Sequence, residues 1–181
     1  MPIARRRLAA LALLPLAWPA AVRAASRREI DDAVGPALAR LREQDGTRIL
    51  ADNAKAILVF PRIIRGGFVL GGQYGNGGMV EGGETTGYYS IAGASFGLQI
   101  GAQTYGLAMF IMTEAALDFF RRSQGWEVGT GPSVVALDAG LAGSLTSTTM
   151  SQDVYAVTFG QTGLMAALTL DGQKISRITP D

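Results

Sequence analysis

Residues 66–106 have the sequence GGFVLGGQYGNGGMVEGGETTGYYSIAGASFGLQIGAQTYG, which carries 14 glycines in 41 residues. Glycine destabilises the interior of a helix, but it is tolerated in twisted strands that pack closely. Phe68, Leu70 and Tyr74 share one parity along the chain, and Phe96, Leu98 and Ile100 share one parity in a later segment. This period of two is typical of strands. The stretch therefore predicts a glycine-rich β-sheet.

The flanking sequence extends this prediction. The apolar run over residues 56–60 ends at Pro61 and predicts a buried strand. Asn76-Gly77 and Glu81-Gly82-Gly83-Glu84 predict tight turns, because hairpin turns need positive φ angles. Residues 163–178 predict a hairpin of two strands around Asp171-Gly172.

Residues 26–44 have the pattern of an amphipathic helix. Its apolar residues recur at spacings of four, four and three, which places them on one face. They are Ile30, Val34, Leu38 and Leu41. Ser26 and Glu29 form a capping-box pattern at the start. Pro36 predicts a kink, or two short helices that meet at Gly35-Pro36.

Two further helices are expected. A short helical turn covers residues 47–53. A clear helix runs from Thr113, a plausible N-cap, to Arg122, with acids near its start and arginines near its end. Gly125 is its expected C-cap.

The expected fold is α+β: a twisted, largely antiparallel, barrel-like β-sheet with the amino-terminal helices and the helix of residues 113–122 packed on it. Residues 25–181 form one expected domain. The residues expected in its core are Ile57, Val59, Phe68, Leu70, Phe96, Leu98, Ile100, Met109, Leu117, Phe120, Val135 and Leu168.

Residues 1–24 have the features of a secretory signal peptide. Arg5-Arg6-Arg7 precedes an uncharged, mostly apolar run over residues 8–22, and Val22-Arg23-Ala24 fits a cleavage site. We expect an exported protein, periplasmic or secreted, with an uncleaved anchor as the alternative. Residues 25–181 keep 12 basic and 15 acidic side chains. This balance argues against a nucleic-acid partner.

The chain contains no histidine and no cysteine. Their absence excludes Ser-His-Asp and Cys-His catalysis, metal ligation by either residue type, and disulfides. The carboxylates have no spacing that suggests a calcium site or a catalytic pair. We expect no enzymatic activity, no metal and no cofactor.

Three glycine motifs resemble functional motifs, but a structural role in strands explains each of them better. Gly93-Ala94-Ser95-Phe96-Gly97 fits the string of a nucleophile elbow but has no histidine base. Residues 71–78 are rich in glycine but lack the Lys-Ser/Thr pair of a phosphate-binding loop. Gly93, Gly97 and Gly101 have the spacing of a transmembrane helix contact. Their polar neighbours and the alternating pattern favour a strand.

The amino-terminal helix is the remaining candidate site. Arg27, Arg28, Arg40 and Arg42 could face anionic headgroups while Ile30, Val34, Leu38 and Leu41 enter the membrane interface. In the alternative arrangement, the apolar residues dock on the sheet. Four acids dilute the positive face, so the pattern alone favours docking. They are Glu29, Asp31, Asp32 and Glu43.

Several motifs together resemble the SYLF domain. They are Lys55-Ala56-Ile57-Leu58-Val59-Phe60-Pro61, residues 66–75, Gly87-Tyr88-Tyr89, residues 94–103, Met112-Thr113-Glu114-Ala115, Gly125-Trp126-Glu127, Gly163-Leu164-Met165 and residues 174–178. The resemblance implies a lipid-binding module. In eukaryotic members it implies phosphoinositide recognition through an amino-terminal amphipathic helix, and in some fungal members actin binding. The helix here is richer in acids than the Lys-rich eukaryotic segment.

The predicted function is therefore non-enzymatic binding to an anionic phospholipid membrane surface, or a phosphoinositide-like one, from the periphery. Two alternatives remain open. One is a protein-binding scaffold related to actin regulators, without a lipid role. The other is a small outer-membrane β-barrel, because glycine-rich alternating strands also suit a barrel in lipid.

Overall fold

The computed structural model describes residues 25–67, 70–96, 101–137, 142, 150–162 and 172–181. These residues form the helices α1 (Arg27–Glu43), α2 (Asp45–Asn53) and α3 (Glu114–Arg122). The strands are β1 (Ala56–Gly67), β2 (Leu70–Glu81), β3 (Glu84–Phe96), β4 (Gly101–Ile111), β5 (Gly125–Glu127), β6 (Val134–Leu137), β7 (Val154–Thr162) and β8 (Lys174–Ile178).

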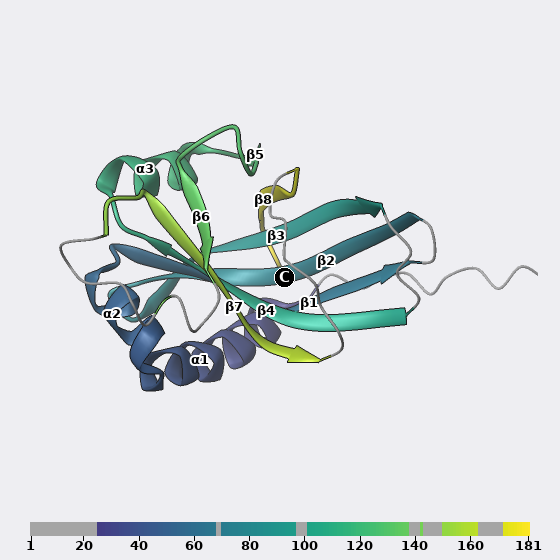
Figure 1. Ribbon diagram of the computed structural model, residues 1–181, viewed down its shortest axis with the longest axis horizontal. Helices are drawn as coiled ribbons and strands as arrows, with labels where there is room; N and C mark the ends of the chain where they lie inside the picture. Colours follow the sequence, from purple (N-terminus) through teal and green to yellow (C-terminus); the bar gives the residue numbers. More distant parts are fainter. Residues whose placement is uncertain (1–24, 68–69, 97–100, 138–141, 143–149, 163–171) are drawn as a thin grey trace, which may run out of the picture.

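All eight strands belong to one curled, barrel-like sheet with the order β5-β8-β3-β2-β1-β4-β7-β6 (Figure 1). Neighbouring strands are antiparallel except β6 and β7, which are parallel. The long strands β1 to β4 form the middle, and the edge strands β5 and β6 have three and four residues. Short edges offer little backbone for unwanted pairing. The predicted α+β class is confirmed.

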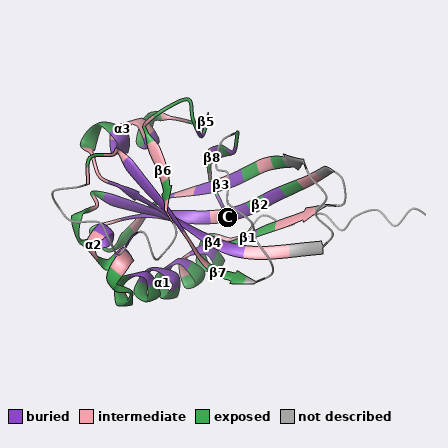
Figure 2. Ribbon diagram, viewed as in Figure 1, coloured by how far each residue is buried: buried purple, intermediate pink, exposed green. Residues whose placement is uncertain are grey.

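Each face of the sheet carries its own buried apolar cluster. Because side chains alternate along a strand, β1 contributes to both. Leu58 and Phe60 point toward the cluster beside α3, and Ile57 and Val59 toward the cluster beneath α1 and α2. Figure 2 shows the buried residues gathered in the half of the sheet that the helices cover.

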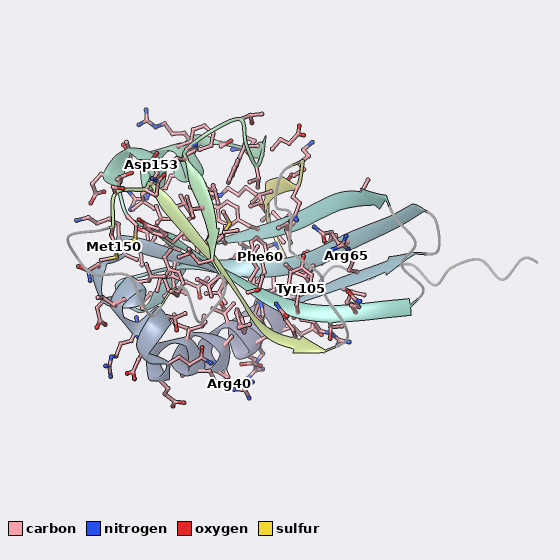
Figure 3. The ribbon with its side chains drawn as sticks, in the orientation of Figure 1. Arg40, Phe60, Arg65, Tyr105, Met150 and Asp153 are labelled. Carbon is pink, nitrogen blue, oxygen red and sulfur yellow. The ribbon has the colours of Figure 1, made fainter. Side chains whose placement is uncertain are left out.

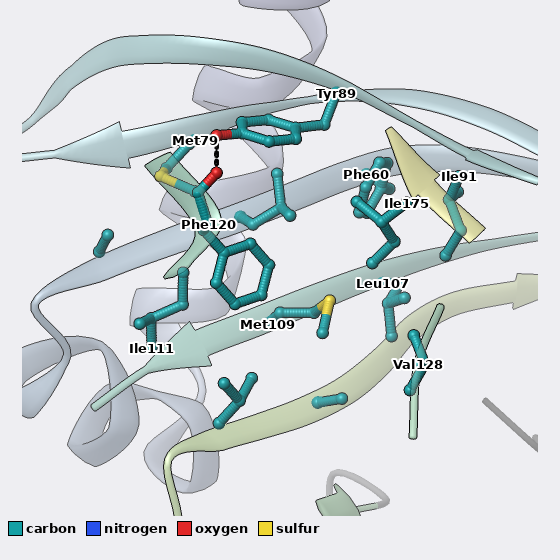
Figure 4. Packing of buried hydrophobic residues seen from close by; sticks show 14 of the residues in the cluster. Phe60, Met79, Tyr89, Ile91, Leu107, Met109, Ile111, Phe120, Val128 and Ile175 are labelled. Carbon is teal, nitrogen blue, oxygen red and sulfur yellow. Dashed lines mark hydrogen bonds between the residues drawn. The ribbon is translucent and has the colours of Figure 1, made fainter. Parts of the chain in front are cut away.

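The cluster on the α3 side contains aromatic rings in edge-to-face contact. The Phe120 and Trp126 ring centroids are 5.0 Å apart, at an interplanar angle of 87°. The Tyr89 hydroxyl donates to the Phe120 carbonyl oxygen at 3.2 Å, which ties β3 to the end of α3 (Figure 4).

The expected core residues can be checked where side chains are described. Ile57, Val59, Met109, Leu117 and Phe120 are buried, as predicted. Val135 is only partly buried, against the cluster beneath α1. The remaining side chains lie outside the described part: Phe68, Leu70, Phe96, Leu98, Ile100 and Leu168.

The first helix confirms its predicted cap, and it is one helix rather than two short ones. The Ser26 hydroxyl accepts from the Glu29 backbone N–H, and the Glu29 carboxylate accepts from the Ser26 backbone N–H, as in a capping box. The helix then continues through Pro36 without division into two. A proline disfavours helical geometry in the preceding residue partly through a clash with its Cβ. Gly35 has no Cβ, so the helix can continue.

The junction of α1 and α2 is fixed by a buried hydroxyl. Thr47 is fully buried, and its Oγ1 donates to the Leu41 carbonyl oxygen, one of the free carbonyls at the end of α1. The predicted helical turn at residues 47–53 is thus confirmed and begins two residues earlier.

Helix α3 starts as predicted but ends differently. The Thr113 hydroxyl accepts from the Ala116 backbone N–H at 3.2 Å. The C-cap is Ser123 in an extended conformation, and Gly125 opens β5. The predicted glycine cap is therefore wrong, because the chain leaves the helix directly into an extended segment.

Two predictions about strand ends are also wrong. Pro61 does not end a strand: β1 runs on to Gly67 and carries a register shift between Phe60 and Ile63, the kind of bulge at which a sheet tolerates proline. Asn76-Gly77 is not a turn but lies inside β2. Gly77 serves close packing against that bulge instead.

The turn predicted at Glu81-Gly82-Gly83-Glu84 is confirmed. Gly82 and Gly83 have φ angles of 58° and 96° between the ends of β2 and β3. The first strand of the hairpin predicted at residues 163–178 lies outside the described residues. Its second strand, β8, pairs with β3 and β5.

Replacing Gly77 by alanine should destabilise the fold. An added Cβ would lie 2.2 Å from the Val59 carbonyl oxygen and 2.7 Å from Phe60 Cδ1. Overpacking of this kind costs about 1–3 kcal/mol. The control is Gly72→Ala in the same strand, where the added Cβ would meet only the Gly93 oxygen at 3.8 Å. It should change the free energy of unfolding by less than about 0.5 kcal/mol. Equal urea midpoints for both variants would contradict the close approach of β1 and β2.

Candidate functional site

The apolar face of α1 is docked on the sheet. Its four predicted membrane-contacting residues, Ile30, Val34, Leu38 and Leu41, are between 1% and 6% exposed. They belong to the same buried cluster as residues of β1 and β2. The structure therefore has the docked arrangement of the two that the sequence allowed.

The four predicted arginines all lie on the exposed surface of α1. Arg27 holds the carboxyl-terminal residues: its Nε donates to the Pro180 carbonyl oxygen, and its backbone N–H donates to the Asp181 carbonyl oxygen, both at 3.0 Å. The side chains of Arg28, Arg40 and Arg42 make no hydrogen bond or ion pair with the rest of the described chain. Figure 3 shows Arg40 on the side of α1 that is turned away from the sheet.

Acidic residues balance these arginines. Helix α1 carries four arginines and four carboxylates, so its formal charge is zero. One carboxylate is used inside the fold, since Asp31 Oδ2 accepts from the Tyr88 hydroxyl at 2.9 Å. Partial burial, and then this hydrogen bond, raise the pKa of Tyr88 above its ordinary value. The helix alone therefore projects only a weak field.

A polar group that the sequence did not reveal lies on the opposite face of the sheet. The Tyr105 hydroxyl donates to Gln73 Oε1 at 3.0 Å, and both side chains are buried. Burial raises the pKa of Tyr105 to about 12, although the nearby positive charge of Arg65 acts in the other direction. Figure 3 shows Arg65 and Tyr105 in the half of the sheet away from the helices. Strand register brings these residues together, and register is not visible in sequence.

The described residues contain no group of three or more acids that could hold a metal ion. Ser95 lies in β3, and its side chain is outside the described part. Asp153 accepts from the backbone N–H and hydroxyl of Ser133 and from the Thr113 hydroxyl, and these bonds lower its pKa. This group ties the start of α3 to β6 and β7, which is a structural role.

A cavity of about 350 Å³ lies where α3 meets β2, β3 and β8. It is lined by Met79, Glu81, Thr86, Tyr89, Arg121 and Arg177. Arg121 pairs with Glu81, and Arg177 Nη1 donates to the Arg121 carbonyl oxygen at 3.0 Å. Arg121 is paired with a carboxylate and Arg177 is held by a backbone carbonyl, so both side chains serve to fix the end of α3 against β2 and β8.

A comparison with protein-family models finds a match in the carboxyl-terminal half of the chain. Residues 92–179 match the family model Ysc84, described as "Las17-binding protein actin regulator". Residues 92–179 belong to the Ysc84, or SYLF, family. It is a family of binding and regulatory domains, not a known enzyme family. A comparison with curated proteins finds no match.

The segment that matches the SYLF family shares one sheet with strands that precede it in the chain. The matched segment begins inside β3 and includes β4 to β8, whereas β1 and β2 precede it. Strands β2 and β1 lie between β3 and β4 in the sheet. In the sheet, β2 and β1 therefore join the matched strands β3, β8 and β5 to the matched strands β4, β7 and β6. Among the described residues no helix is long and apolar enough to cross a membrane.

If α1 is docked as observed, Leu41→Ala should lower the free energy of unfolding by about 2–5 kcal/mol, because Leu41 is 1% exposed and its loss leaves a cavity. The neighbouring exposed residue supplies the control, since Arg42→Ala should have an effect below about 0.5 kcal/mol. Urea unfolding followed by circular dichroism measures both. An unchanged free energy of unfolding for Leu41→Ala would show that the helix is not packed on the sheet.

Proposed function

We propose that this SYLF domain binds the surface of anionic phospholipid membranes from the periphery, reversibly and without catalysis. The observation that carries the proposal is the set of three exposed arginines on α1, Arg28, Arg40 and Arg42, which have no partner in the described chain. The family resemblance supports lipid as the ligand class. The family also supports a binding role rather than an enzymatic one.

The magnitudes favour an electrostatic contact by α1 rather than insertion of its apolar face. Burying a Val, Leu or Ile side chain is worth about 1.5–3 kcal/mol. Moving the four apolar residues of α1 from the sheet into a membrane would lose this burial energy in the protein and regain a similar amount in the membrane, so the net gain would be small. Each arginine near an anionic surface contributes about 1 kcal/mol, and nearby acids subtract from the total. Binding should therefore be modest and should weaken as salt shortens the screening length.

The residue types present support a non-catalytic role. The chain has neither histidine nor cysteine, so an activated nucleophile would need another base. The Tyr105–Gln73 pair is neutral, and burial opposes ionisation of the hydroxyl. Neither group is suited to proton transfer near neutral pH.

The proposal includes export. Residues 1–24 have the charge pattern and apolar run of a secretory signal, so we place the mature protein, residues 25–181, in the periplasm or outside the cell. Its membrane would then be a surface of the cell envelope. Amino-terminal sequencing of the protein from a bacterial expression host should begin near residue 25. A start at residue 1 in the mature fraction would count against export.

A protein partner is the second candidate function. The family is described as a Las17-binding actin regulator, and that description is the observation that favours a protein ligand. In that case the exposed arginines would meet acidic side chains instead of lipid headgroups. Absence of binding to all lipids tested would favour this alternative.

Co-sedimentation with vesicles tests the lipid proposal. The protein should sediment with vesicles of phosphatidylglycerol and phosphatidylcholine in equal parts at low salt, and much less at high salt or with phosphatidylcholine alone. Changing Arg28, Arg40 and Arg42 to Glu should weaken binding by about tenfold or more, since each 1.4 kcal/mol is a factor of ten. Arg27 is kept because it holds the carboxyl terminus.

The matched control changes Arg48 and Arg122 to Glu. Both arginines are exposed but are paired with acids inside their own helices, Asp45 and Asp118. Unchanged sedimentation of the triple variant would remove the α1 arginines from the mechanism.

A further inference from the structure

A pair of exposed apolar side chains lies on the half of the sheet that the helices leave uncovered. Ile64 is 49% exposed and Tyr74 is 46% exposed, and they are the exposed large hydrophobic residues of the described chain. They are direct partners in the register of β1 and β2. Their neighbours Ile63 and Gly75 face the opposite, buried side, where Ile63 is fully buried.

These two residues share the α1 side of the sheet. A Cβ added to Gly78 would lie 3.4 Å from Val34 Cγ2, so Gly78 faces the helix. Asn76 and Tyr74 follow on the same face of β2, because side chains alternate along a strand. Helix α1 begins at Arg27, whose guanidinium lies 6.0 Å from the ring centroid of Tyr88, the partner of Gly78. Beyond this point none of the helices formed by the described residues lies over the face (Figure 1).

Two cations flank the apolar pair. The register places Ile64, Tyr74, Ala92 and Lys174 in one row across four strands, and Arg62, Asn76, Ser90 and Ser176 in the next. The side chains of Arg62 and Lys174 are exposed and have no hydrogen bond or ion pair within the described chain. Neither row contains an acid. Glu127 lies opposite Lys174 on β5 and offsets part of its charge.

We infer that this distal patch, formed by Arg62, Ile64, Tyr74 and Lys174, is the part of the domain that enters an anionic phospholipid bilayer. The inference rests on the proposed function and adds an apolar surface to the electrostatic contact made by the α1 arginines. Ile64 and the Tyr74 ring enter the interfacial region, while Arg62 and Lys174 contact headgroup phosphates. Tyrosine suits this depth because its ring is apolar and its hydroxyl polar.

Two arguments favour a bilayer as the occupant. The first is charge: two cations without partners, together with Arg27 at the start of α1, complement a surface of anionic headgroups. The second is size. A stable protein interface buries about 1,200–2,000 Å², which two half-exposed apolar residues cannot anchor alone. Shallow insertion of a small apolar group beside cations is sufficient for peripheral membrane binding.

The patch also supplies what α1 lacks. The apolar face of α1 is buried, and its charges cancel. The distal patch combines exposed apolar surface with net positive charge. The two surfaces adjoin at Arg27, so both can face one membrane.

A tryptophan at position 74 tests insertion directly. Trp126 is 6% exposed and provides a constant background. The fluorescence of Tyr74→Trp should shift to shorter wavelength when vesicles of phosphatidylglycerol and phosphatidylcholine are added, whereas the parent spectrum should not. Each protein is measured with and without residues 1–24, because Trp18 lies in that segment. An unshifted spectrum in a sample that sediments with the vesicles would overturn the inference.

Paired variants then separate the two surfaces. The double variant Ile64→Thr and Tyr74→Thr keeps strand-forming residues and should bind these vesicles at least about tenfold more weakly than the parent. The double variant Arg62→Gln and Lys174→Gln should weaken binding at low salt. Its effect should be larger than that of the control double variant on α1, Arg40→Gln and Arg42→Gln. Circular dichroism confirms folding. Parent-like binding of the threonine variant overturns this inference and leaves the proposed function standing. Absence of binding by the parent overturns both.

Discussion

The packing of α1 against β1 and β2 determines which surfaces of this domain are available to a partner. The helix can lie close to the sheet because glycine occupies the position beneath Val34: an added Cβ at Gly78 would already be in contact with it. Once docked, the helix buries the apolar residues that an amphipathic membrane helix would use. The helix as a whole carries equal numbers of arginines and acids. Any apolar contact with a membrane must then come from elsewhere in the molecule.

The bulge in β1 provides such a surface. Phe60 and Ile63 both belong to the cluster on the α3 side, although strict alternation would place them on opposite faces. The extra residue between them reverses the face of the sheet to which each later side chain of β1 points. Ile64 therefore faces outward beside Tyr74. Pro61 lies in this bulge and has no N–H to leave unpaired in the middle of the sheet. One local irregularity therefore fixes both the inner core and the exposed patch.

Helix caps and a tight turn could be predicted from the sequence, whereas contacts that depend on strand pairing could not. The Ser26–Glu29 capping box, the Thr113 cap and the Gly82-Gly83 turn depend on residues close in the chain, and each is confirmed. Asn76-Gly77 was mistaken for a turn because its glycine makes room for another strand, a contact that only register reveals. For the same reason the sequence offered the arginines of α1 as candidates but gave no signal for Ile64 and Tyr74. These two residues are separated along the chain and meet only through the β1–β2 pairing.

A reversible crosslink between helix and sheet most directly tests whether the domain meets a membrane with α1 docked. The chain has no cysteine, so Val34→Cys with Gly78→Cys creates a single possible disulfide, with Thr85→Ser to remove the methyl that lies 3.1 Å from the new Cβ. A Cβ at position 78 would lie 3.4 Å from Val34 Cγ2, so the two positions are in contact, as a disulfide between them requires. The oxidised and reduced proteins should bind anionic vesicles equally well. Binding that is lost on oxidation and regained on reduction would show that the helix must leave the sheet, and would contradict this mechanism.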